Sequence, residues 1–229
     1  MTLAIIIPPR QMIHLPINAM YLASAARSMR RSVEFHDYTF ETGRTKVSVD
    51  KDRNVVFIQA DNSDEYNNAL AVRGLLKQMK CAVFGDYCTH VNPDELTGWH
   101  YVVVGDVEEA MNSISTLSVR KGVVTGAAVT DLDKLPYPAW DYIDISKYFP
   151  SKHEAYIPIQ TSRGPCNLSM AYQRVRIRTS GSVIREMCAL NAKYEFKRFI
   201  ISDEFVARCG NYSYFKNEIR ERGFECLIK

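Results

Sequence analysis

Short apolar runs rich in β-branched residues alternate with longer amphipathic stretches through the first half of the chain. The apolar runs are Leu3–Ile7, Val33–His36, Val55–Ala60, Cys81–Phe84 and Tyr101–Val104. Between them, apolar residues recur at helical spacing in 18–30, from 63 to about 79, and in 107–117. Strands that alternate with helices form a parallel sheet covered on both faces. Residues 1–126 are therefore predicted to form one doubly wound α/β domain with five strands, and 46–49 is a candidate for a small extra strand.

The character of the sequence changes after residue 126. Residues 127–155 include the proline- and aromatic-rich run Leu132–Asp141 and have no sustained period, so we interpret them as a linker that packs on a surface. In 156–229 the alternation resumes. It predicts strands at Ile157–Thr161, Phe199–Ser202 and Glu225–Ile228, and helices at Ser180–Lys193 and Tyr212–Glu221. Eight such units close an α/β barrel, so the predicted fold is a Rossmann-like, flavodoxin-like parallel sheet followed by a partial α/β barrel.

Composition disfavours several classes of protein. The longest uncharged apolar stretches, Leu3–Pro9 and Tyr101–Gly105, are far shorter than the roughly 20 residues that span a bilayer. Six cysteines occur without any CxxC pair, which is typical of reduced thiols rather than of a disulfide framework or a zinc ribbon. The net charge of +3 is too small to steer the whole molecule onto a nucleic acid. We therefore expect a cytoplasmic protein that binds neither membrane nor nucleic acid and holds no metal on cysteines or histidines.

Ligands of a doubly wound sheet bind outside the carboxyl ends of the strands, where the strand order reverses. The loops at these ends are predicted at 8–15, 61–66, 85–93 and 105–109. They carry side chains suited to a large polar ligand, among them Arg10, His14, Asp61, Asn62 and Ser63. Neither GxGxxG nor GxxxxGKS/T follows any strand, which disfavours a dinucleotide or a P-loop nucleotide. The alternative is that these residues only cap helices and form tight turns.

Segments along nearly the whole chain share their order and spacing with a known family. They are Ile5–Pro9, Ala19–Ala23, Phe84–Glu95, Val102–Glu108, Leu135–Asp141, Pro158–Gly164 and Phe199–Glu204. Together they resemble the cobalamin-dependent radical SAM (S-adenosylmethionine) enzymes. The first four resemble the cobalamin-binding domain of that family, the fifth resembles its linker, and the last two resemble the start of its radical SAM barrel.

The resemblance implies cobalamin as a cofactor, with the corrinoid lying against the four carboxyl-end loops. The residues implied to bind it are Pro9, Arg10, Asp61, Asn62, Ser63, Tyr66, Gly85, Cys88, Gly105, Asp106 and Glu108. Gly85 and Gly105 begin two of these loops and are expected to let a flat ring approach the backbone. The Asp-x-His-x-x-Gly signature that supplies a histidine to cobalt in other cobalamin proteins is absent. The family usually does without a lower-ligand histidine, so this absence is consistent with cobalamin.

The cluster loop departs from the pattern of the family. Family members hold a 4Fe–4S cluster on three cysteines spaced CxxxCxxC, directly after a Ser-Arg-Gly that corresponds to 162–164. If Cys166 is the first ligand, Met170 and Gln173 take the other two places. In the register that agrees better with the flanking residues, the first cysteine is deleted, and Leu168 and Ala171 replace the others. At most one thiolate remains where three are needed, so we expect neither the cluster nor cleavage of S-adenosylmethionine.

Two further features concern the second half. Arg174, Arg176 and Arg178 alternate with apolar residues, and we interpret them as a solvated basic edge of a strand. The sequence reaches only about the third strand of a barrel, so a protein partner that completes the barrel is expected.

Three hypotheses for function remain open at this stage. The first is a cobalamin-binding protein of the radical SAM lineage whose second half holds no cluster. The second is a cobalamin-dependent radical SAM enzyme, of the methyltransferase or cyclase type, represented by a truncated or altered chain. The third is a flavodoxin-like interaction module without a cofactor.

Overall fold

The computed structural model describes residues 2–41, 46–50, 55–151, 154–164, 175–201 and 212–228. They divide into two compact units. The first unit includes 2–129 and 136–143, and the second includes 130–135 and the described residues from 144 onward. The predicted cluster loop around Cys166 lies outside the described residues, as does Arg174.

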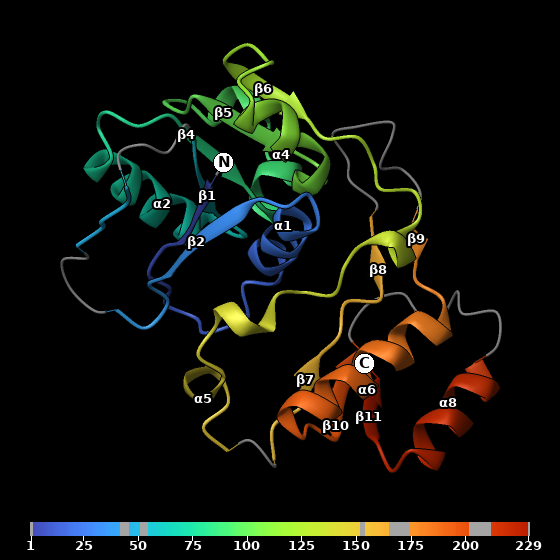
Figure 1. Cartoon of the computed structure of the whole chain (residues 1–229). Coiled ribbons are helices and arrows are strands. Elements are labelled where there is room, and N and C mark those ends of the chain that lie inside the picture. The colour runs from blue at the N-terminus through green and yellow to red at the C-terminus, as the bar shows by residue number, and fades with distance from the viewer. Residues whose placement is uncertain are drawn as a thin grey trace. The chain divides into compact units, whose positions relative to one another are not determined.

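A six-stranded parallel sheet forms the centre of the first unit (Figure 1). Its strands are β1 (Thr2–Ile7), β2 (Ser32–Asp37), β3 (Val56–Gln59), β4 (Cys81–Phe84), β5 (Tyr101–Val104) and β6 (Gly122–Thr125), in the order β2-β1-β3-β4-β5-β6. The helices of the unit are α1 (Ile17–Ser28), α2 (Ser63–Leu75), the short α3 (Asp86–His90) and α4 (Val107–Ser115), with 3-10 turns η1 (Pro93–Glu95) and η3 (Trp140–Tyr142). This is the predicted doubly wound fold, and its strand order reverses between β1 and β3.

Both faces of the sheet are buried, which explains why its strands are continuous apolar runs rather than alternating ones. Leu3, Ile5 and Ile7 of β1 point to the face that α1 and α4 cover. Ala4 and Ile6 point to the opposite face, which α2 covers. This period of two follows from the pleat of the strand. The two apolar layers fix the register of β1, and with it the position where the loop after β1 begins.

Three predictions for the first unit are wrong in detail. The sheet has a sixth strand, β6, which the sequence analysis missed because it is a short edge strand with only Val124 buried. The candidate strand at 46–49 has no regular structure. The helix after Ser63 ends at Leu75 rather than near Met79, because the chain turns at Leu76, where the backbone is no longer helical.

Part of the predicted linker packs on α1. The amide of Ala139 donates to the carbonyl of Met20 at 3.1 Å, and Ser24 Oγ donates to the carbonyl of Tyr137. Arg27 forms an ion pair with Asp141, with 2.6 Å between Nη1 and Oδ2. Residues 136–143 therefore belong to the first unit even though they follow β6 by ten residues.

The second unit contains a parallel three-stranded sheet in the order β11-β10-β7. Its elements are η2 (Leu132–Lys134), α5 (Ile145–Tyr148), β7 (Ile157–Pro158), α6 (Ser180–Tyr194), β10 (Arg198–Ile201), α8 (Tyr212–Glu221) and β11 (Glu225–Ile228), and β8 (Ser162–Arg163) pairs antiparallel with β9 (Arg176–Ile177). These βα units agree with the predicted partial barrel. The first strand is shorter than predicted, since the chain leaves the sheet after Pro158 and continues into β8.

Arg178 corrects the interpretation of the basic residues as a solvated edge. Its side chain is buried and forms an ion pair with Glu186 of α6. It also donates from Nη1 to the carbonyl of Gln160 at 3.0 Å and from Nη2 to Ser182 Oγ at 3.1 Å. Arg178 stands just before Thr179, the N-cap of α6, and there the alternation of the preceding strand has ended. Its position relative to the helix, rather than the strand pattern, decides its burial.

None of the helices in the described ranges combines the length and the apolar character that a membrane span requires.

Candidate functional site

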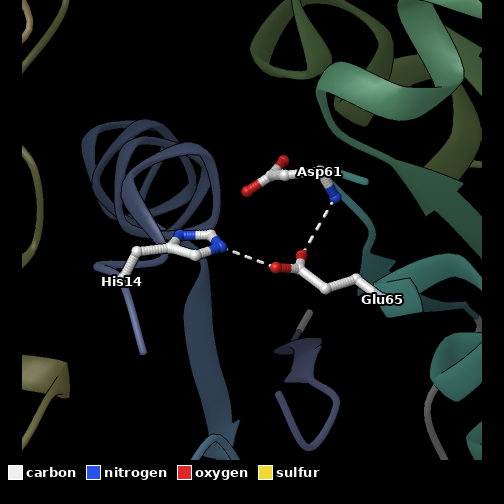
Figure 2. Close-up of side chains that lie close together, drawn as sticks. All are labelled: His14, Asp61 and Glu65. Carbon is white, nitrogen blue, oxygen red and sulfur yellow. Dashed lines mark hydrogen bonds and ion pairs between the residues drawn. The ribbon is translucent and has the colours of Figure 1, made fainter. Parts of the chain in front are cut away.

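The carboxyl ends of β1 and β3 lie side by side where the strand order of the first unit reverses. Four ionisable side chains meet there. Arg10 and His14 come from the loop after β1, and Asp61 and Glu65 come from the loop after β3 and the first turn of α2. Figure 2 shows the last three of them, with His14 and Glu65 facing each other. We call these four residues the switch-point network.

The position of Glu65 follows from the way α2 begins. Asn62 is the N-cap of α2, and its side chain accepts a hydrogen bond from the amide of Glu65 at 3.0 Å. Glu65 reaches back and accepts from the amide of Asp61 at 3.0 Å and from Asn62 Nδ2 at 3.1 Å. This arrangement resembles a capping box, except that the Glu65 carboxylate accepts from the amide of Asp61, one residue before the N-cap, rather than from the amide of the N-cap itself. It turns the carboxylate of Glu65 toward the end of the sheet and buries it.

Arg10 closes the loop after β1. Its side chain has no exposed surface, and its Nη1 donates to the carbonyl of His14 at 3.1 Å. The same nitrogen lies 3.0 Å from His14 Nδ1. Its Nη2 lies 3.3 Å from Glu65 Oε2 and 3.8 Å from Asp61 Oδ2. One buried guanidinium therefore holds together the two loops that meet at the switch point.

Hydrogen bonding and burial shift the pKa values of this network in different directions. The hydrogen bond to Glu65, at 2.6 Å from His14 Nε2, raises the pKa of His14 although burial and Arg10 oppose the change. Burial and the nearby charge of Asp86 raise the pKa of Asp61. Burial also acts to raise the pKa of Glu65, but its partners His14 and Arg10 outweigh burial and lower it. Within the network, the pKa values of His14 and Asp61 are therefore raised and that of Glu65 is lowered.

A His, an Asp and a Glu are also ligands for a divalent metal, and their ligand atoms lie within 4.8 Å of one another. Every one of the four carboxylate oxygens already has a partner. Asp61 accepts from Asn18 Nδ2 at 3.0 Å, from the amide of Asp86 at 3.1 Å and from Gln59, while Glu65 accepts the bonds described above. The guanidinium of Arg10 supplies positive charge at this position. The arrangement favours a network balanced by arginine and a proton over one balanced by a metal ion.

The structure brings several of the predicted ligand residues to the switch point. Asp61, Asn62 and Arg10 belong to the network or contact it, and the carbonyl of Pro9 accepts from Asn68 Nδ2 at 2.9 Å. Gly85 has a φ of 125°, and a Cβ atom there would lie 2.4 Å from the carbonyl oxygen of Ala60. The backbone of the neighbouring loop therefore approaches Gly85 closely on the side where a Cβ atom would stand.

Other predicted residues are engaged elsewhere. Cys88 is buried in the apolar layer under α2, and burial raises the pKa of its thiol far above the usual range. Tyr66 accepts a hydrogen bond from Trp99 Nε1 at 3.1 Å. Asp106 accepts from the amide of Val129 at 2.7 Å. Glu108 is buried at the start of α4, Ser63 is exposed at the first position of α2, and the amide of Gly105 donates to Thr89 Oγ1 at 3.2 Å.

Sequence reasoning missed three side chains of the site. Glu65 stands three residues after Asn62, which is the spacing of a capping box and was a usable signal. Gln59 is a polar residue at the end of an apolar strand, and its side chain accepts from the amide of Ala19 at 3.1 Å. Asn18 gave no signal, because its bonds to Asp61 and Asp86 depend on how α1 packs.

The comparisons with known proteins give a likeness in fold. No protein-family profile matches the sequence. No curated protein matches it either. Two solved structures of the radical SAM methyltransferase TsrM from Kitasatospora setae are similar: one with tryptophan substrate and a SAM analog bound (TM-score 0.61, 16% identity), the other with cobalamin and a 4Fe–4S cluster bound (TM-score 0.58, 15% identity). Each match covers 96% of this chain and 50% of the TsrM chain, so the chain spans half the length of that protein and shares its α/β fold over that half.

Proposed function

We propose that the chain is a cobalamin-binding protein of the cobalamin-dependent radical SAM lineage. One observation carries the proposal. A polar network built from two loops stands at the switch point of a parallel sheet, and this sheet belongs to a fold shared with a protein solved with cobalamin bound. Ligands of doubly wound sheets bind at this place.

The side chains present fit a corrinoid by their chemistry. The ring of a corrinoid is flat, and it carries amide arms that both donate and accept hydrogen bonds. Asn62 and Ser63 are exposed beside the network, and Asn18 and Asp86 offer an amide and a carboxylate close together, 3.3 Å apart. We propose that these groups hold the amide arms of the ligand, so that corrinoid contacts come from the loops after β1, β3 and β4.

The role of the chain in this proposal is to bind and orient. A bound corrinoid would supply a cobalt centre for the transfer of alkyl groups. The network keeps the two loops at a fixed separation, and Gly85 brings the third loop against them. We also propose that Gly105, Asp106 and Glu108 of the fourth loop contribute to corrinoid binding. Tyr66 and Cys88 belong to the same proposal.

The binding test uses an exposed position at the site and a matched position away from it. Ser63→Trp places a bulky side chain at the first turn of α2, and Leu75→Trp places the same side chain at its last turn, about 18 Å along the helix. Equilibrium dialysis against hydroxocobalamin measures Kd. We expect the unchanged chain to bind, Ser63→Trp to bind at least about tenfold more weakly, and Leu75→Trp to bind normally. Failure of the unchanged chain to bind would favour a cofactor-free interaction module.

We further propose that the chain does not cleave S-adenosylmethionine reductively. Cluster assembly needs three thiolates around one loop, and between Thr161 and Gln173 the sequence offers only Cys166. After anaerobic reconstitution with iron, sulfide and a strong reductant, the yield of 5′-deoxyadenosine should equal that of a Cys166→Ala control. A yield clearly above the control would support the alternative, a cobalamin-dependent radical SAM enzyme of the methyltransferase or cyclase type.

A protein partner for the second unit is a separate part of the proposal. Among the described residues, β11 pairs only with β10, and it is the edge of its sheet. Between α8 and β11 lies a groove of about 510 Å³ lined by Phe215, Ile219 and Phe224. Parallel strands are normally covered on both faces, and the unpaired backbone groups of an edge strand can pair with a further strand. A further strand and helix, from a partner or from additional chain, would pair with β11 and fill the groove.

A further inference from the structure

We propose that Met12 and Ile13 form a preformed apolar tip that binds the ring face of the corrinoid. This inference rests on the proposed function and adds the residues that recognise the apolar part of the ligand. Met12 is 79% exposed and Ile13 is 59% exposed, although both are large apolar side chains. They are neighbours in the sequence, and they lie in the loop that leaves the carboxyl end of β1 at the switch point.

The loop that carries this tip is anchored on both sides. Arg10, two residues before Met12, is fully buried and donates to the carbonyl of His14, one residue after Ile13. Its backbone amide also donates to the carbonyl of Thr39 at 3.4 Å. On the other side, His14 is held by Glu65, and the side chain of Leu15 is buried. The exposure of Met12 and Ile13 is therefore a consequence of how the loop is held.

A tip held in this way has a low entropic cost of binding, because the loop is already ordered before the ligand arrives. The tip lies in the same loop as Arg10 and His14 of the switch-point network. Corrinoids combine these two properties, since methyl groups crowd the faces and rim of the ring and amides extend from its periphery. The pairing of an apolar tip with an amide-binding network therefore matches a corrinoid better than a nucleotide, whose phosphates would face Asp61, Glu65 and Asp86.

The test compares exposed apolar side chains at the proposed site with an exposed apolar side chain away from it. The double variant Met12→Ser/Ile13→Ser removes the tip, and Leu75→Ser removes a side chain that is also 59% exposed but lies at the last turn of α2. Met12→Leu/Ile13→Val keeps the tip apolar. Equilibrium dialysis gives Kd for hydroxocobalamin and for cobinamide, which lacks the nucleotide tail, and thermal unfolding checks that each variant folds.

We expect the serine double variant to bind both corrinoids at least about tenfold more weakly, while Leu75→Ser and the conservative double variant bind within about twofold of the unchanged chain. Binding by the unchanged chain with equal Kd in the serine double variant would overturn the inference and leave the proposed function standing. Failure of the unchanged chain to bind either corrinoid would overturn both. Loss of self-association in the serine double variant, without an effect on Kd, would assign the tip to a contact between protein molecules.

Discussion

Replacement of Arg10 by methionine should lower the free energy of unfolding of the first unit by about 3–5 kcal/mol. The guanidinium is fully buried between two carboxylates, of which Glu65 has 3% and Asp61 14% of its side chain exposed. Removal of the guanidinium takes away the cation that Asp61 and Glu65 share, leaves His14 as the basic partner of Glu65, and puts in its place a side chain that offers no hydrogen bond. The loss of a buried partner costs more than the intact pair contributes, because the remaining charge cannot return to water.

Tryptophan fluorescence in a urea titration measures this effect selectively. The chain has two tryptophans, Trp99 and Trp140, and both belong to the first unit. Arg120→Met removes the same charge from an exposed position and serves as the matched control, with an expected change below about 0.5 kcal/mol. A loss below about 1 kcal/mol in the Arg10 variant would mean that the guanidinium does not hold the network together.

The Arg10 variant should also titrate differently. Arg10 acts to lower the pKa of His14, so its removal should raise that pKa further above the ordinary value of 6.5. A histidine with a raised pKa in the folded state stabilises the fold fully below the pKa of the unfolded chain and loses this contribution as the pH rises through the folded pKa. The variant should therefore be least stable at alkaline pH. NMR titration of the His14 ring in both proteins gives the shift directly.

Replacement of Glu186 by alanine should destabilise the second unit by about 3–5 kcal/mol. Burial raises the pKa of Glu186 although Arg178 opposes the change. Burial of the charged carboxylate therefore costs free energy, which the ion pair with Arg178 partly offsets. Without Glu186, the buried guanidinium of Arg178 loses its carboxylate partner, and the oxygens of Gln160 and Ser182 that accept from it carry no charge to replace that carboxylate. The double variant Arg178→Met/Glu186→Leu removes both charges at similar volume and should recover most of the stability.

Hydrogen exchange of α6 and β10 amides measures this second effect, since both tryptophans lie in the first unit. Faster exchange in Glu186→Ala, restored in the double variant, is the expected pattern. Equal destabilisation of the single and double variants would show that the two side chains contribute through packing rather than through their charges.

The elements predicted most accurately from the sequence are those with turn-forming residues on both sides. The limits of β4, β5, α8 and β11 agree residue for residue with the apolar or amphipathic runs. The sequence did not predict the edge strand β6. An edge strand has a neighbouring strand on one side only and buries few side chains, so its sequence needs few apolar residues. The continuous apolar runs of the central strands predicted a sheet buried on both faces, and two apolar layers pack on it.

The site was predictable to the level of loops but not of side chains. The topology of a parallel sheet was enough to place Arg10, Asp61 and Asn62 near the switch point. The direction of each side chain depended on packing that the sequence does not display, such as the turn of Glu65 back toward Asp61. Arg178 shows the same limit, because its position before α6 rather than its neighbours in sequence buries it.

Hydrogen exchange of the full chain with and without hydroxocobalamin locates the corrinoid site. The corrinoid should slow exchange in 9–15, in 60–66 and in the loop after β4, which all lie at the carboxyl edge of the sheet, and should leave exchange in α8 and β11 unchanged. Unchanged exchange in those loops at saturating corrinoid, or protection confined to the second unit, would contradict the assignment of the switch point as a corrinoid site.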